Sequence, residues 1–131
     1  MTLRFAAFVA VSGLSACSGD ETLTAYGASD IVWALAELDG VPYTAEAELE
    51  FPGPGRFVGR TPCNQFSGQV SAPYPWFAVR ALTTTDKTCQ DQTEEDMFLK
   101  SLNAASLAEV AGDTLVLSTP EGPKMVFKSR E

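Results

Sequence analysis

Short stretches of alternating apolar and polar residues, separated by turns rich in glycine and proline, constrain the fold of this chain more than any other feature. In residues 47–51, alanine, leucine and phenylalanine alternate with two glutamates, as expected for a strand with one buried and one solvated face. Pro52-Gly53-Pro54-Gly55 then favours a tight turn, and Arg56–Gly59 returns from it. The pattern predicts a β-hairpin.

The rest of the domain repeats this pattern, with one exception. An apolar stretch at 31–35 ends in an Asp-Gly turn, and we expect further strands at 66–70, 76–82, 114–117 and 124–128. The exception is 93–105, where apolar residues recur at helical spacing behind Thr93, a candidate N-cap, and three acidic residues. We therefore predict a mainly β (α+β) fold, a compact antiparallel sheet or small barrel with one packed helix.

The N-terminal residues have the layout of a secretory signal. Arg4 precedes an apolar run from Phe5 to Val11, which is far shorter than the ~20 residues of a membrane-spanning helix. Leu14-Ser15-Ala16-Cys17 resembles the bacterial lipobox, which implies cleavage before Cys17 and lipid on its sulfur. Several acyl chains together give a stable anchor. We thus expect a signal peptide at 1–16, a lipidated tether at 17–29 and a folded domain at 30–131.

Localisation follows from the same segment. Ser18, rather than an aspartate, follows the lipobox cysteine, and by that resemblance an outer-membrane destination facing the periplasm is favoured. In such an oxidising compartment the two cysteines left after Cys17, Cys63 and Cys89, form an even pair. We expect a disulfide between them, and the alternative is one or two buried free thiols.

Charge and composition exclude several classes of function. Acidic residues outnumber basic ones by 17 to 9, and the formal net charge is −8. An acidic surface repels phosphate backbones and anionic lipids, so we expect no binding to nucleic acid and no membrane contact except through the lipid anchor. We also expect a monomer. Histidine is absent, so a Ser-His-Asp relay cannot form, and the sequence implies no metal site or cofactor.

Across the domain, six segments in order resemble the META domain family. The segments are Trp33–Gly40, Leu49–Gly59, Cys63–Gly68, Thr85–Cys89, Glu95–Leu102 and Gly112–Phe127. The resemblance covers about residues 31–128 and implies a compact, mostly antiparallel β domain with one helix. Because this domain occurs in exported proteins that are often linked to envelope stress, drug tolerance or virulence, the resemblance implies such a setting for this chain. It implies no particular reaction.

Four residues are candidates for binding, and each has a structural alternative. Asn64 and Gln65 follow Cys63 in a loop that could hydrogen-bond a ligand, although Asn64 could equally satisfy backbone groups in a tight turn. Arg56 could bind a partner or be an ordinary exposed charge of the hairpin. Trp76, between proline and a run of apolar residues, could be a core aromatic or a partly exposed contact.

These observations favour a non-enzymatic envelope lipoprotein that binds a protein or a small apolar molecule. Two alternatives stay open. A pair among the 17 acidic residues could hydrolyse envelope glycans, and a rigid loop at Pro52–Gly55 or Ala72–Pro75 could inhibit an envelope protease.

Overall fold

The computed structural model describes residues 19–122 and 124–130. The signal peptide and Cys17 lie outside these residues. Within them the elements, in chain order, are η1 (Leu23–Tyr26), β1 (Val32–Leu38), β2 (Val41–Pro42), β3 (Glu48–Gly53), β4 (Arg56–Arg60), β5 (Gln65–Val70), β6 (Val79–Thr84), α1 (Gln92–Ala104), β7 (Leu107–Ala111), β8 (Thr114–Ser118) and β9 (Lys124–Arg130).

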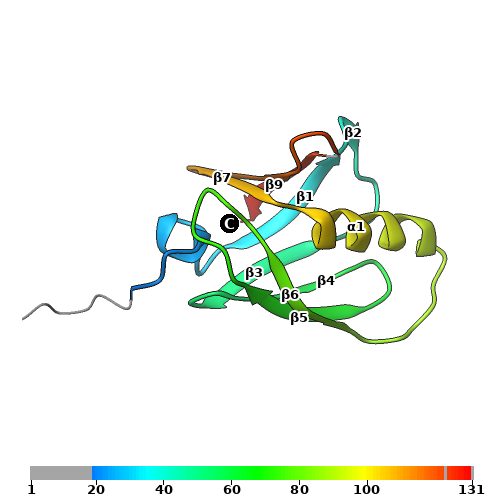
Figure 1. Cartoon of the computed structure of the whole chain (residues 1–131). Helices are drawn as coiled ribbons and strands as arrows, with labels where there is room; N and C mark the ends of the chain where they lie inside the picture. Colours follow the sequence, from blue (N-terminus) through cyan, green and yellow to red (C-terminus); the bar gives the residue numbers. More distant parts are fainter. Residues whose placement is uncertain (1–18, 123, 131) are drawn as a thin grey trace, which may run out of the picture.

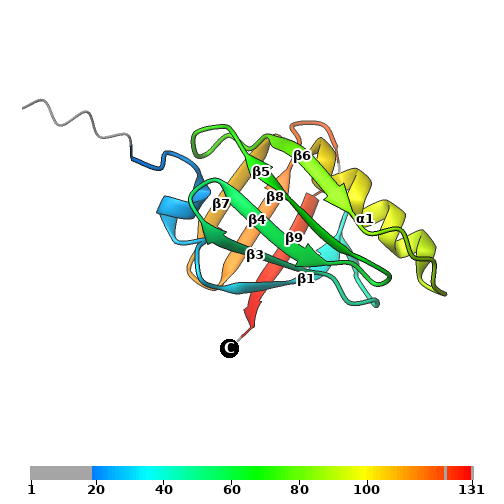
Figure 2. The same cartoon turned by 90° about the horizontal axis from the view of Figure 1, so that it is seen from below.

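The strands form one antiparallel sheet that is curled into a half-barrel (Figures 1 and 2). Its order is β6-β5-β4-β3-β1-β9-β8-β7, and β2 pairs with β1. The two edges approach each other where Trp76 forms an isolated bridge with Leu107, and the Phe77 N–H donates to the Ser106 carbonyl. The helix α1 packs against β6 and β8. The predicted fold class is confirmed.

The core lies inside the curl. Trp33 is fully buried, and its indole N–H donates to the Ala28 carbonyl at 2.9 Å. Phe66 contacts the rings of Phe57 and Phe98 at centroid distances of 6.1 and 5.6 Å, so α1 inserts an aromatic side chain between strands. Tilted aromatic pairs of this kind add to the stabilisation from buried area.

Two glycines allow the aromatic rings to lie flat on the strands. A Cβ atom at Gly68 would overlap the ring of Phe57, and one at Gly59 would overlap both the ring of Phe66 and the backbone of Glu48. Glycine within a strand commonly marks such a close approach. These positions therefore exclude any side chain because of packing, not because of a turn.

The starts of α1 and β6 differ from the predictions for reasons that the structure shows. The helix begins at Gln92 with Asp91 as N-cap, not at Thr93, because the Asp91 carbonyl already accepts from the Glu95 N–H at 3.0 Å. The Gln92 amide also bonds to the carboxylates of Glu95 and Asp96 within the first turn. The strand predicted at 76–82 begins only at Val79 and runs to Thr84. A register shift opposite β5 inserts an extra residue there and changes the phase of the alternation.

The folded part also begins before residue 30, so the predicted tether at 17–29 is too long. Leu23 and Ala28 are fully buried, and η1 packs against β7. The strand β7 was not predicted at all, although it lies at one edge of the sheet. These two unpredicted segments pack on each other.

Candidate binding groove

A polar groove lies on the outer face of the sheet. Antiparallel pairing sets Glu48, Arg60 and Gln65 side by side on β3, β4 and β5, with their neighbours Leu49, Gly59 and Phe66 toward the core. Because side chains alternate between the two faces of a strand, the first three point away from the core. They form one row of the groove.

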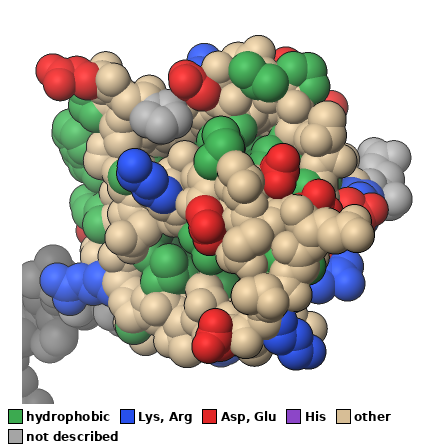
Figure 3. All heavy atoms as spheres, turned by 90° about the vertical axis from the view of Figure 1, so that its right-hand side faces the viewer, with side chains coloured by type: hydrophobic (Ala, Val, Ile, Leu, Met, Phe, Trp, Pro, Cys, Tyr) green, Lys and Arg blue, Asp and Glu red, His purple; other side chains and the backbone are tan. Residues whose placement is uncertain are grey.

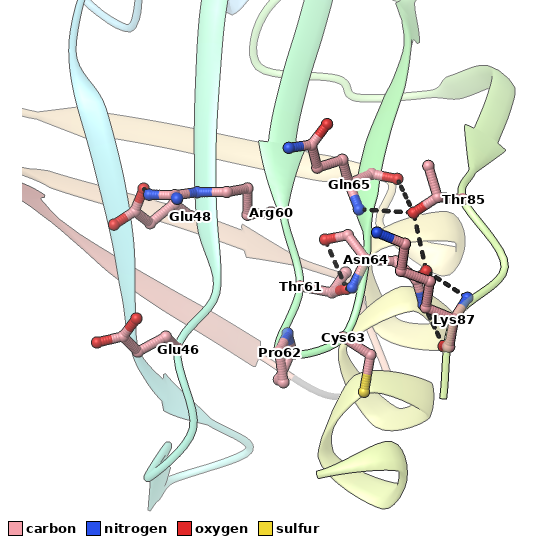
Figure 4. A pocket seen from close by; sticks show the side chains of 10 residues that line it. All are labelled: Glu46, Glu48, Arg60, Thr61, Pro62, Cys63, Asn64, Gln65, Thr85 and Lys87. Carbon is pink, nitrogen blue, oxygen red and sulfur yellow. Dashed lines mark hydrogen bonds and ion pairs between the residues drawn. The ribbon is translucent and has the colours of Figure 1, made fainter. Parts of the chain in front are cut away.

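The groove consists of two adjoining pockets. The first has a volume of about 370 Å³ and lies between the end of β4, the loop before β5 and the residues after β6 (Figure 4). The second continues over Val58 and Ser67 toward Thr83. Both are lined by Glu48, Arg60, Gln65 and Thr85.

One wall of the groove is held by ion pairs around Glu48. Arg60 donates to one carboxylate oxygen at 3.0 Å, and Arg130 pairs with the other. The Glu48 side chain is only 10% exposed, whereas those of Arg60 and Arg130 are 64% and 52% exposed. The hydrogen bond that Arg60 donates to Glu48, and then the negative charge of Glu48, raises the pKa of Arg60. The exposed guanidinium group of Arg60 is thus fixed at the groove.

The floor of the first pocket is organised by Asn64. Its amide nitrogen donates to the Lys87 carbonyl at 2.8 Å and to both carboxylate oxygens of Glu95 at 3.0 Å. Its amide oxygen accepts from the Thr85 hydroxyl at 2.8 Å and from the Lys87 N–H at 2.7 Å. Both ends of the side chain are therefore bonded within the protein. Asn64 positions the loop after β6.

Glu95 lies beneath this network and is only 1% exposed. Besides Asn64 it accepts from the Thr61 hydroxyl and from the Gln92 amide at 3.0 Å. A buried carboxylate needs such donors, because an unpaired one is costly. The spacing of Glu95 with Phe98 and Leu102 on the buried face of α1 could have identified it from the sequence.

A disulfide joins Cys63 to Cys89, with 5.4 Å between their Cα atoms. It ties the loop before β5 to the segment before α1. The predicted bond is thus present in the structure, and together with the Asn64 network it fixes the same two segments.

The four predicted binding residues lie in three places. Asn64 and Gln65 line the groove, but Asn64 is 9% exposed while Gln65 is exposed. Arg56 lies at the opposite end of β4 from Arg60. Trp76 is 57% exposed and lies outside the groove, in the bridge to β7. The structure brings together the first two only.

Within residues 19–122 and 124–130, no group of three histidine, cysteine or acidic side chains is arranged to hold a metal ion. On the face drawn in Figure 3 the acidic side chains are spread out. In the same residues, no helix has both the length and the apolarity needed to cross a bilayer.

A curled antiparallel sheet with one helix and a disulfide-held polar groove defines a small β domain without a recognisable catalytic set in its described residues. Residues 22–131 match the META domain, and the chain belongs to this family. No curated protein matches it. The family description names no enzymatic activity.

Solved structures share the fold at low sequence identity. A DUF4847 family protein from Bacteroides vulgatus has a TM-score of 0.67 and 13% identity, covering 80% of this chain and 96% of its own. A protein from Burkholderia xenovorans has a TM-score of 0.63 and 16% identity, with coverage of 82% and 86%. At these identities the likeness concerns the fold alone.

Proposed function

We propose that this chain is a non-enzymatic envelope lipoprotein, anchored through Cys17, whose groove binds an extended segment of another envelope protein in a stress-tolerance role. The observation that carries the binding proposal is the groove itself. The anchor rests on the Leu14-Ser15-Ala16-Cys17 segment, and the setting rests on the family resemblance.

The lining of the groove supports a polypeptide rather than a small apolar molecule. Gln65, Ser67 and Thr83 offer amide and hydroxyl groups, and Arg60 offers a fixed guanidinium. Backbone amides and carboxylates of an extended peptide pair with such groups. The disulfide and the Asn64 network hold the groove in one shape before binding, which lowers the entropic cost of association.

The glycan hydrolase alternative has less support. Glu48 is the most central carboxylate of the groove, and both of its oxygens are engaged by arginines. A general acid must instead turn a proton toward the glycosidic oxygen. The protease inhibitor alternative needs a free protruding loop, yet the 72–75 loop is bonded to the domain through Tyr74. The 52–55 loop is likewise bonded through Gly55, whose carbonyl accepts from the Val70 N–H and whose N–H donates to the Thr24 hydroxyl.

Site-specific photo-crosslinking tests the binding proposal. A photoreactive residue replaces Gln65 in the full chain, and the matched control replaces Gln69. Both glutamines lie on the same face of β5 and are exposed, but only Gln65 lines the groove. We expect one discrete adduct in cells from position 65 and none from position 69. Equal labelling at both, or none at either under envelope stress, would contradict the proposal.

Intact mass measurement tests the anchor separately. The mature protein should begin at Cys17 and carry the mass of its acyl chains. A Cys17→Ser variant should retain the signal peptide and lose the lipid, whereas Cys63→Ser should still be lipidated. An unmodified Cys17 in the mature protein would refute the anchor without affecting the groove.

A further inference from the structure

Two exposed aromatic side chains and a half-buried one lie near the start of the folded part. Among the described residues, the large exposed hydrophobic side chains are Tyr26, Val41, Trp76 and Met97. Tyr26 stacks on Tyr74 with 4.7 Å between ring centroids and 14° between planes. Trp76 is in the same turn as Tyr74, because its N–H donates to the Pro73 carbonyl at 2.8 Å.

This aromatic surface, defined as Tyr26, Tyr74 and Trp76, is rigidly attached to the start of the domain. The Tyr74 N–H donates to the Glu21 carbonyl at 2.7 Å, and the Tyr74 hydroxyl accepts from the Val110 N–H at 3.0 Å. The turn that carries the surface is therefore fixed both to the first described residues and to β7.

The chain between Cys17 and Glu21, to which this surface is bonded, is short. Four peptide units separate Cys17 from Glu21, and even a fully extended chain of that length spans at most about 14 Å. A lipid on Cys17 would place its glycerol group in the interfacial layer of the bilayer. Glu21, and the turn bonded to it, would then lie within about 14 Å of that layer.

The chemistry of the surface suits that layer. Tyrosine and tryptophan are enriched at membrane interfaces because each has an apolar ring and a polar group that stays hydrated. Glu21, which is bonded through its carbonyl to the turn that carries the surface, is acidic, so it provides no attraction to anionic lipid. The match is to zwitterionic headgroups and the upper acyl chains.

We propose that Tyr26, Tyr74 and Trp76 form a second, interfacial membrane contact that fixes the orientation of the lipid-anchored domain. This proposal rests on the anchor proposed above. It orients the domain with η1, at the left of Figure 1, toward the bilayer. The helix α1, at the right of Figure 1, then lies away from the bilayer. A tethered domain needs little additional affinity to stay in one orientation, because its effective concentration at the membrane is already high.

Tryptophan quenching in vesicles tests the contact. The full lipidated chain is reconstituted into phosphatidylcholine vesicles with plain or brominated acyl chains. The chain has two tryptophans, of which Trp33 is fully buried and Trp76 is 57% exposed. The difference between wild type and Trp76→Phe therefore isolates Trp76. We expect loss of Trp76 emission in brominated vesicles and an unchanged emission from Trp33.

A matched control moves the probe to the far side. Met97 lies on α1 and is 51% exposed, so Met97→Trp in the Trp76→Phe background should not be quenched. Equal quenching at 76 and 97, or none at 76 while the protein sediments with the vesicles, would overturn the interfacial contact and leave the anchor standing. A protein that fails to sediment would overturn both. A blue shift without bromine quenching would place Trp76 against another copy of this chain and would equally overturn the membrane contact.

Discussion

Replacing Asn64 tests whether this residue organises the groove or binds a ligand directly. Asn64→Ala removes the amide that donates to the buried Glu95 carboxylate. It also leaves the N–H and the carbonyl of Lys87 without their hydrogen-bond partner. Hydrogen bonds to charged groups contribute about 1.5–3 kcal/mol, and an unsatisfied buried backbone group costs about 1–3 kcal/mol. Because Lys87 is exposed, water can replace part of the hydrogen bonding that its backbone loses. The expected decrease in the free energy of unfolding is therefore about 3 kcal/mol.

The matched control is the adjacent amide, Gln65→Ala. Gln65 is exposed and its side chain is not required by the Asn64 network, so its loss should change the free energy of unfolding by less than about 0.5 kcal/mol. Urea unfolding followed by the emission of buried Trp33 measures both variants. Asn64→Ala should lower the midpoint by roughly 1–2 M. If Asn64→Ala is as stable as Gln65→Ala but abolishes the crosslink formed from position 65, then Asn64 acts directly on the ligand and our reasoning is refuted.

Three further perturbations have defined outcomes. Replacing Cys63 and Cys89 with alanine opens a loop closed over a separation of 26 residues, which should cost ~3.5 kcal/mol of unfolding free energy in denaturant. Wild type under reductant should match that variant. Gly68→Ala should destabilise by about 1–3 kcal/mol through overlap with the ring packed on it, whereas Gly53→Ala, with nothing near its Cβ, should not. Burial, and then neighbouring acidic side chains, raise the pKa of Tyr43 above its ordinary 10.0. Unfolded Tyr43 therefore ionises first, and the urea midpoint should fall as pH rises past 10 more steeply than in Tyr43→Phe.

Local patterns predicted those parts of the fold that depend on local interactions. The hairpin of β3 and β4 and the final strands β8 and β9 follow from alternation and from turn residues between them. The pattern predicts a tether for the segment containing Leu23 and Ala28, although both are buried, because two isolated apolar residues show no periodicity. Leu23 lies in η1, which packs against β7, and β7 itself is short and directly follows a helix.

The candidate site shows the same limit. Asn64 and Gln65 are adjacent amides, and the sequence identified both without separating the buried one from the exposed one. That difference depends on Glu95, which is 31 positions from Asn64 and comes from another element. Sequence spacing on α1 could have predicted that Glu95 is buried, but only the fold shows what it binds.

The position of β9 has a consequence for biogenesis. This strand, Lys124–Arg130, lies inside the sheet between β1 and β8, and it contributes the fully buried Phe127. Ribosomes synthesise chains from the N-terminus, so β1 and β8 lack the strand that joins them until residues 124–130 have been made. Contacts between such distant segments form late and slowly. If the chain is exported as we propose, this delay keeps it unfolded and able to thread through a translocation channel.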